Sequence, residues 1–349
     1  MEYEEILIRA KEKLEKCKVC SDCDCKVCSG KVPGPGGKGS GSTAQRNREF
    51  WRNYVKLNQD VIYKSDEINT EVEFLGQKFT MPVYVAPIGM LELNWGGKYD
   101  DYTYSEDVIS GADMAGTFAF TGGGATDSCF YEPLKAIENL GKAAVPTIKP
   151  WRMKLGEERI KIAEKSNPIA IAMDVDSAGL PHSNASLEPM MAKSVEDIEN
   201  IVKISNKPFI VKGIMTAKSA KVIADTGIYA IVVSNHGGRV MDDGLATGEV
   251  LEEIREAIGD KVKVLVDGGI RTGGDVIKAL ALGADGVLIG RPCTIAAYGG
   301  GAEGVYKYLE KIKNEIKDTM KMIGCNNISE INKEHIFTFS SNNYIMKCN

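Results

Sequence analysis

The sequence lacks any long apolar run. No window of its 349 residues approaches the roughly 18 consecutive apolar residues that a transmembrane helix needs. The N-terminus also lacks the basic and apolar regions that mark a secretory signal peptide. These two absences predict a chain without a membrane partner, and we expect it to be cytoplasmic.

The sequence also lacks an excess of positive charge. It has 43 Lys and Arg against 48 Asp and Glu, which gives a net charge of -5. Binding to a phosphate backbone needs Lys and Arg concentrated on one face, so we expect no nucleic-acid partner. The hydrophobic fraction of 43% is typical of a folded chain with a sizeable core.

The chain divides into three zones by composition. The first is a short helical pattern followed by a cluster of cysteines that ends at Cys28. A connector rich in Gly, Pro and Ser spans 29–43, and an alternating α/β region follows it. We therefore predict an N-terminal helical, Cys-rich extension over 1–43 and a single α/β domain over 44–349. The helix is expected to pack through Tyr3, Ile6, Leu7, Ala10 and Leu14.

Short β-branched runs alternate with amphipathic helical patterns in the α/β region, as in repeated βα units around a parallel sheet. The eight predicted strands are Met81–Ala86, Thr117–Thr121, Ala144–Lys149, Ile169–Val175, Phe209–Lys212, Ala230–Ser234, Val262–Asp267 and Gly286–Gly290. Helical patterns include 194–205, 217–225, 248–258 and 272–282. Eight successive units without a reversal favour a (β/α)8 TIM barrel over the alternative of an open, doubly wound sheet.

The last two predicted strands end in glycine-rich loops with arginines. The seventh is followed by Asp267-Gly268-Gly269-Ile270-Arg271, and the eighth ends in Gly290-Arg291. In such barrels a phosphate often binds at these two loops. The glycines let backbone amides approach it, a helix beginning near Gly273 adds a favourable dipole, and both arginines supply charge-assisted bonds. These features predict a phosphate cradle.

The sixth predicted strand ends in Ser234-Asn235-His236-Gly237-Gly238-Arg239, and the fifth ends at Lys212. An unperturbed histidine pKa near 6.5 leaves much of the imidazole neutral at cellular pH, so His236 is a candidate general base. A lone histidine is more often structural. Here Arg239 and Lys212 place an anion clamp and a cation on the same rim, which favours a catalytic role.

Together these segments resemble the family of FMN-dependent 2-hydroxy acid oxidases and dehydrogenases, which includes glycolate and lactate oxidases. The similarity covers about 74–335 and is densest from Lys207 onward. It is carried by Val211-Lys212-Gly213, 234–239, 267–271, 278–284 and Gly290-Arg291-Pro292, with weaker matches at 86–90 and 322–325. The resemblance implies an FMN cofactor, a small-molecule 2-hydroxy acid substrate and a homotetramer. It leaves the electron acceptor open.

The resemblance also implies a role for each matching residue. His236 would be the catalytic base, Asp176 would pair with it, Arg239 would hold the substrate carboxylate, and Lys212 would face the N1/O2 edge of the flavin. The predicted cofactor contacts are Pro87, Ile88, Gly89, Gly122, Lys149, Asp174, Lys212, Ser234, Asp267, Gly268, Gly269, Arg271, Gly290 and Arg291.

The sequence departs from the family where substrate recognition is expected. It has no tyrosine in 34–41, and the chain reads Ile148-Lys149-Pro150-Trp151 at the end of the third strand, where the family has a glutamine and then a tyrosine. A second carboxylate-binding arginine is missing from 176–183, which offers only His182, and the 176–212 segment is short. Cofactor chemistry is therefore expected to be kept and substrate recognition to be rebuilt.

Several residues in these segments keep two interpretations. His182 either contacts an anion or caps a turn, and Lys149 approaches the flavin or the substrate. Trp151 is either packing or a substrate wall. The glycines at 122–124 are interpreted as opening space above the flavin for a larger substrate.

Five of the nine cysteines lie within 17–28. A disulfide is not expected in a reducing compartment. Four thiolates at such spacing can bind Zn²⁺ or an iron–sulfur cluster, and Cys17, Cys20, Cys23 and Cys28 are the predicted ligands. Free thiols or redox-sensing pairs are the alternative. A cluster would give the flavin an electron exit, whereas zinc would only staple the segment.

Two other function classes compete with the oxidoreductase. One is a non-redox FMN enzyme similar to the type 2 isopentenyl diphosphate isomerases, and the other is a flavoprotein whose catalysis is altered. The pair of His236 and Arg239 favours a hydroxy acid over a prenyl diphosphate.

Overall fold

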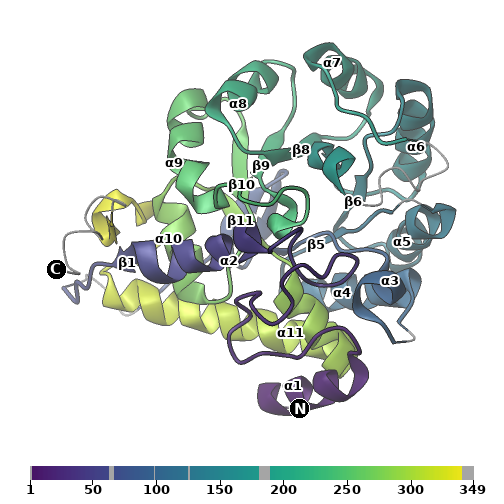
Figure 1. The fold of residues 1–349 in the computed structure, drawn as a ribbon. Coiled ribbons are helices and arrows are strands. Elements are labelled where there is room, and N and C mark those ends of the chain that lie inside the picture. Colours follow the sequence, from purple (N-terminus) through teal and green to yellow (C-terminus); the bar gives the residue numbers. More distant parts are fainter. Residues whose placement is uncertain (1, 63–66, 98, 125, 181–188, 340–349) are drawn as a thin grey trace.

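A computed structural model of the protein describes residues 2–62, 67–97, 99–124, 126–180 and 189–339. Eight parallel strands form a closed barrel in chain order, with the last strand pairing with the first (Figure 1). They are β4 (Val83–Val85), β5 (Ala119–Thr121), β6 (Ala144–Ile148), β7 (Ile171–Asp174), β8 (Phe209–Ile214), β9 (Ala230–Val233), β10 (Lys263–Val266) and β11 (Gly286–Ile289). The predicted barrel is confirmed, and only β8 extends beyond its predicted end.

Helices that follow the strands surround the barrel (Figure 1). They are α4 (Asp101–Met114), α5 (Asp127–Leu140), α6 (Met153–Lys165), α7 (Val195–Ile204), α8 (Ala217–Ala224), α9 (Thr247–Ile258), α10 (Gly273–Ala281) and α11 (Arg291–Met322). The four helices predicted from periodicity are all present, each with ends within two residues of the prediction. Among the described residues, no helix is both long and apolar enough to cross a membrane.

Alternate residues of each strand face two separate hydrophobic cores. In β9, Val232 packs inside the barrel, whereas Ile231 and Val233 pack outward against the helices. A hairpin of β2 (Val72–Phe74) and β3 (Gln77–Phe79) packs its Phe74 ring against Phe118 and Tyr229, which directly precede β5 and β9. The hairpin thus covers the amino ends of the strands, and the carboxyl ends remain for a site.

The N-terminal extension packs on the barrel. Helix α1 (Tyr3–Lys13) lies along α11, with Ile6 and Ala10 fully buried (Figure 1). The chain then crosses the carboxyl ends of the strands, where the Lys38 ammonium donates to the carbonyl oxygens of Gly179 and Val240 at 2.9 and 3.0 Å. The extension therefore contributes directly to the surroundings of any site at this end of the barrel.

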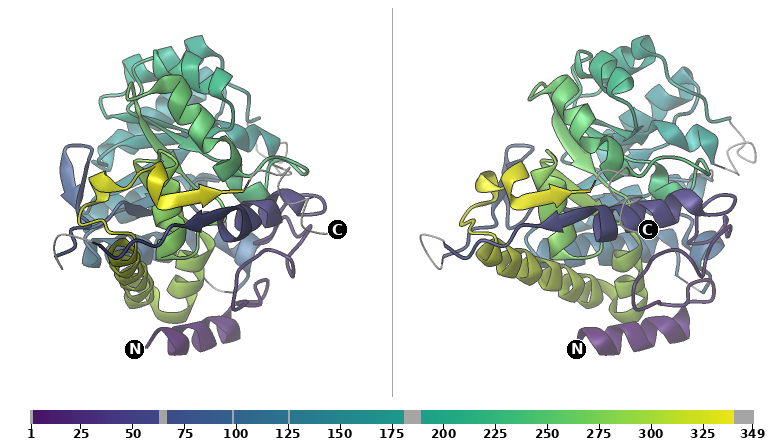
Figure 2. Two further views of the ribbon diagram at one scale, coloured as in Figure 1. Left: turned by 90° about the vertical axis from the view of Figure 1, so that its left-hand side faces the viewer. Right: turned by 60° about the vertical axis from the view of Figure 1, so that its left-hand side comes forward.

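A second segment also crosses this end of the barrel. It consists of α2 (Ser42–Glu49), the π-helical turn η1 (Phe50–Tyr54) and β1 (Val55–Leu57), and we call it the strap. Its end, β1, pairs antiparallel with β12 (Ile336–Thr338), so two segments far apart in sequence lie side by side (Figure 2). The strap is thereby fixed at its far end.

Helices α4 and α11 approach closely at Gly111, and this contact yields a stability prediction. A β-carbon at Gly111 would lie 2.5 Å from the Ala302 carbonyl oxygen and 2.6 Å from the Val305 β-carbon. We expect Gly111→Ala to destabilise the protein by about 1–3 kcal/mol through overpacking. The measurement is the free energy of unfolding in urea.

Gly156 in α6 is the matched control. A β-carbon there meets only the Trp151 carbonyl oxygen, at 3.9 Å. Gly156→Ala should stabilise the protein by about 0.5–1 kcal/mol, because alanine has the higher helix propensity. Equal effects of the two substitutions would contradict this account of the α4–α11 contact.

Candidate active site

The carboxyl ends of the strands surround a cavity with an empty volume of about 1210 Å³, its open mouth included. Its lining includes most of the residues predicted from the sequence: Pro87, Ile88, Gly89, Gly122, Lys149, Asp174, Lys212, His236, Arg239, Asp267, Gly268, Gly269, Arg271, Gly290 and Arg291. Ser234 and Asp176 are not part of the lining, but they form hydrogen bonds with the lining residues Lys212 and His236, respectively. His182 lies outside the described residues.

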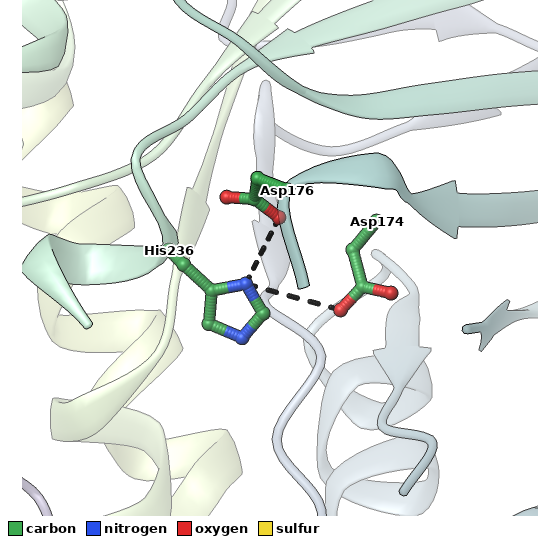
Figure 3. Close-up of side chains that lie close together, drawn as sticks. All are labelled: Asp174, Asp176 and His236. Carbon is green, nitrogen blue, oxygen red and sulfur yellow. Dashed lines mark hydrogen bonds and ion pairs between the residues drawn. The ribbon is translucent and has the colours of Figure 1, made fainter. Parts of the chain in front are cut away.

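A histidine and two aspartates form the centre of this site (Figure 3). His236 lies three residues beyond the end of β9 and has φ +56, a conformation that is uncommon for a residue other than glycine. Its backbone N–H donates to Ser234 Oγ at 3.1 Å. On the ring, Nδ1 lies 3.1 Å from Asp176 Oδ1 and 3.9 Å from Asp174 Oδ2. The backbone turn therefore aims the imidazole at the end of β7.

Burial and charge both act on the protonation of this pair. Burial lowers the pKa of His236 well below its usual value, and the charges of Lys212 and Lys149 lower it further. Burial raises the pKa of Asp176, although both lysines oppose the change. The imidazole is therefore neutral near pH 7, which is the form that a general base requires.

Two buried lysines at the strand ends pair with carboxylates. Lys149 follows β6, and its Nζ lies 2.6 Å from Asp174 Oδ2. Lys212 on β8 donates to Ser234 Oγ at 2.9 Å and lies 3.4 Å from Asp267 Oδ2. Burial alone would lower the pKa of Lys212, but Asp267 and its neighbouring aspartates outweigh burial and raise it. Lys212 is thus held in the charged form within the site.

Arg239 borders the cavity through a contact that the sequence analysis missed. Its Nη2 donates to Asn94 Oδ1 at 2.7 Å. Asn94 lies in α3 (Leu91–Trp95) and also accepts from the Gly34 N–H. Burial, with Arg291 as the second cause, lowers the pKa of Arg239 to about 10. No motif marks Asn94, because its importance depends on a contact 145 residues away.

The predicted phosphate cradle is present in part. Gly268 and Gly269 have φ +93 and +81, and both line the cavity beside Arg271 and Arg291. Within the described chain, neither guanidinium forms an ion pair with a carboxylate; Arg271 donates to the Cys23 carbonyl oxygen, and Arg291 donates to those of Pro35 and Gly237. Two cations without an anionic partner suit a bound phosphate.

The expected contribution of the α10 N-terminus is not borne out. Gly273 is absent from the cavity lining, and its N–H donates to Glu315 Oε2 at 2.7 Å. The preceding N–H groups of Arg271 and Thr272 donate to Asp275. A phosphate cannot bind amides that are already paired in this way, so the loop glycines and the arginines remain as the cradle.

The strap supplies further residues that the sequence analysis missed. Asn47 and Asn235 exchange side-chain hydrogen bonds of 2.8 and 2.9 Å, and Trp51 Nε1 donates to the Gly268 carbonyl oxygen at 2.8 Å. A β-carbon at Gly269 would lie 2.2 Å from the Asn47 carbonyl oxygen. The strap therefore holds the loops after β9 and β10 in place.

Two open interpretations are decided by packing. Trp151 is 3% exposed, packs edge-on against Phe130 and is absent from the cavity lining, so it is a packing residue. The glycines after β5 line the cavity, but they are needed for close packing. A β-carbon would lie 2.2 Å from the Ile88 carbonyl carbon at Gly122 and 2.4 Å from the Thr147 oxygen at Gly123. The interpretation that they open space is therefore wrong for these two.

The predicted cysteine ligands line a second, smaller pocket beside the cavity. Cys17, Cys20, Cys23, Cys25 and Cys28 all contribute to its walls, together with Arg291. All five are free thiols. Within the described parts of the chain, the group of three or more potential metal ligands whose ligand atoms lie within 4.8 Å of one another is Asp174, Asp176 and His236. The cysteine sulfurs do not gather as closely.

Known proteins share both this fold and these segments. The model of the FMN-dependent dehydrogenase family matches residues 35–190 and 181–338. Glycolate oxidase 1 of Zea mays is 30% identical over 341 residues, covering 85% of this chain and 88% of the relative, and a peroxisomal (S)-2-hydroxyacid oxidase of Arabidopsis thaliana is 29% identical, covering 87% and 90%. The chain belongs to the FMN-dependent dehydrogenase family.

A solved structure agrees with this assignment. A mandelate oxidase variant crystallised with 2-hydroxy-phenylacetamide is 26% identical and superposes with a TM-score of 0.79. The match covers 97% of this chain and 98% of that chain. The likeness therefore extends over almost the whole of both chains.

The residues of the cavity fit FMN. Within the described chain, buried polar atoms of four lining residues lack a hydrogen-bond partner, namely Trp95 Nε1, Asp174 Oδ1, Arg239 Nε and Asp267 Oδ1. Such atoms are costly unless a ligand or water satisfies them. The glycine loops with Arg271 and Arg291 would hold the terminal phosphate, and Lys212 and Lys149 would lie toward the ring system.

Arg291 tests the phosphate cradle. Replacing it with methionine keeps the apolar stem and removes a charge-assisted contact, which costs about 1.5–3 kcal/mol. We expect the Kd of Arg291→Met for FMN to rise by roughly 10- to 150-fold. The measurement is fluorescence titration of the apoprotein with FMN.

Arg46→Met is the matched control, because Arg46 pairs with Glu249 on the surface. Its affinity for FMN should stay at the wild-type value. Unchanged affinity in Arg291→Met, with wild-type unfolding behaviour, would remove Arg291 from the cradle.

Proposed function

We propose that the protein oxidises a 2-hydroxy acid to the 2-oxo acid, with His236 as the base that takes the substrate hydroxyl proton. The observation that carries the proposal is the bond between His236 and Asp176 beside two buried lysines and Arg239 in one cavity. Oxidation of such a substrate removes two electrons and two protons, one from the hydroxyl group, which His236 takes, and one from the α-carbon. Bound FMN supplies the two-electron acceptor.

Asp176 sets the tautomer of the base. Its carboxylate engages Nδ1, which places the imidazole proton there and leaves Nε2 with a lone pair. When Nε2 accepts the substrate proton, the charge that develops on the ring lies 3.1 Å from the Asp176 oxygen. The aspartate therefore orients the base first and stabilises its protonated form afterwards.

Arg239 is the proposed partner of the substrate carboxylate. Its Nη2 is held by Asn94, while its buried Nε has no partner within the described residues. An arginine fixed at one nitrogen and open at another can bind a carboxylate without a large loss of side-chain freedom. Lys149 is paired with Asp174, so it serves the charge balance of the site and is not a second clamp.

We further propose that the substrate carries a larger apolar side chain than glycolate or lactate. The cavity is lined in part by four apolar residues, Met90, Leu93, Leu180 and Met190. The mandelate oxidase that superposes on this chain was crystallised with an aryl compound. Small substrates would leave this lining unfilled. Their carboxylate would also have to bind without the family's second arginine, which this chain lacks.

The base is tested by comparing two histidine variants. We expect His236→Ala to slow substrate-driven flavin reduction by about 10²–10⁴-fold, because the proton acceptor is lost. FMN should remain bound, since the phosphate cradle is built from other loops. The measurement is anaerobic stopped-flow flavin bleaching with a panel of 2-hydroxy acids, in which aryl and long-chain acids should react faster than glycolate and lactate.

His335→Ala is the control, because His335 lies near the C-terminal strand and contacts Cys325. It should reduce its flavin at the wild-type rate. Retained reduction in His236→Ala would overturn the assigned base. Failure of the wild type to bleach with every acid in the panel would instead point to a non-redox FMN enzyme or to an altered flavoprotein.

The charge of Lys149 predicts a shift in pH dependence. Because burial and the two lysines hold the pKa of His236 below 6.5, the acidic limb of kcat/KM in the wild type should fall below that pH. Lys149→Gln removes one of the charges that disfavour protonation, so the pKa of His236 rises. The acidic limb should therefore move to higher pH.

Lys142→Gln removes a lysine of the surface, which pairs with Asp113, and should leave the limb in place. The readout is the pH profile of flavin reduction in the wild type and both variants. A limb that stays fixed or moves to lower pH in Lys149→Gln would contradict the electrostatic account of His236.

A further inference from the structure

The five N-terminal cysteines face a common space. They line a pocket with an empty volume of about 450 Å³ between residues 16–35 and the start of α11. Residues 14–41, which carry them, form neither α-helix nor strand, so short turns can bring the thiols together. Five cysteines of one short segment therefore line the same pocket, which indicates a binding site.

Two residues of this segment other than glycine have positive φ angles. Cys25 is 3% exposed and has φ +66, and Val19 has φ +49. Side chains other than glycine, asparagine and aspartate seldom adopt this conformation, and it persists only where the surroundings impose it. The Cys28 thiol donates to the Cys25 carbonyl oxygen at 3.8 Å. The turns therefore bring the five cysteines to the walls of one pocket.

Positive charge surrounds the pocket. Lys16, Lys18, Lys31 and Arg291 contribute to its walls. Arg271 donates to the Cys23 carbonyl oxygen at 3.1 Å, and its Nη2 lies 3.7 Å from the Cys23 sulfur. A buried group of thiolates is stable only with compensating charge. These cations supply it, so the pocket is suited to an anionic thiolate centre.

The separation of the sulfurs distinguishes between two kinds of centre. Tetrahedral Zn²⁺ with bonds of about 2.3 Å holds its four sulfurs roughly 3.8 Å apart. Within the described chain, the group of three ligand atoms gathered within 4.8 Å is the one around His236, and the cysteines form none. Sulfurs spread around an open space suit a polynuclear centre, whose several iron atoms keep the ligating thiolates further apart.

We propose that four of these five cysteines bind an iron–sulfur cluster. The cluster site is separate from the active site but adjoins it, because Pro35, Trp95 and Arg291 line both pockets. The cluster proposal does not depend on the oxidase activity proposed above. Either proposal could be wrong without affecting the other.

The test begins with the full chain purified without oxygen. The protein is reconstituted with ferrous iron and sulfide, desalted, and analysed for iron, zinc, acid-labile sulfide and FMN. Chemical analysis is needed because flavin absorbance overlaps that of a cluster. We expect iron and acid-labile sulfide in equal amounts, and an electron paramagnetic resonance signal after reduction with dithionite.

Paired substitutions locate the ligands. Cys17→Ala with Cys20→Ala leaves three thiols in the pocket, so no four-thiolate site survives, and iron and sulfide should fall to background. Cys17 and Cys20 are the chosen pair because Cys20 is exposed and Cys17 is only partly buried. Cys129→Ala with Cys325→Ala removes the same number of thiols elsewhere and should keep the full iron content.

The FMN content of each variant reports whether it has folded, and the wild-type analysis decides the question even if the first pair does not fold. Stoichiometric zinc without iron or sulfide would overturn the proposal, as would a folded, FMN-replete wild type without metal. Full iron and sulfide in the Cys17 and Cys20 pair would overturn it as well.

Discussion

Two buried lysines and three aspartates at one rim of the barrel determine the properties of the site. Burying a charge is costly unless it is paired, and each lysine here has a carboxylate within reach: Asp174 for Lys149 at 2.6 Å and Asp267 for Lys212 at 3.4 Å. Asp176 is left without a lysine of its own. It pairs with His236 instead, and burial, reinforced by the charges of Lys212 and Lys149, lowers the pKa of that imidazole and keeps it neutral. The protonation state of His236 therefore depends on its burial and on the charges of the neighbouring lysines and aspartates.

Much of this arrangement could be predicted from the sequence, because barrel strands carry simple patterns. Apolar runs located all eight strands, and parallel strands necessarily bring their carboxyl ends together. Residues at those ends, such as His236 and Lys212, could thus be assigned to one rim before any contact was known. Local sequence was sufficient wherever position along a strand determines position in space.

Contacts between loops could not be predicted in this way. The pairing of Asn47 with Asn235 joins residues 188 positions apart, and nothing near Asn94 marks it as the partner of Arg239. The N-terminus of α10 carries the pattern of an anion site, yet Glu315 of α11 occupies its amide. A sequence pattern indicates which groups are available, whereas tertiary packing decides which of them are already taken.

The pairing of β1 with β12 has a consequence for the order of events during synthesis. The strap holds the loops after β9 and β10, but β12, which anchors it, follows every barrel strand in the chain. At about 5–20 residues per second, a ribosome needs on the order of tens of seconds to travel from one strand to the other. All eight barrel strands are therefore made before the mouth can be completed. A chain cleaved before β12 would retain every barrel strand but lose the anchor of its strap.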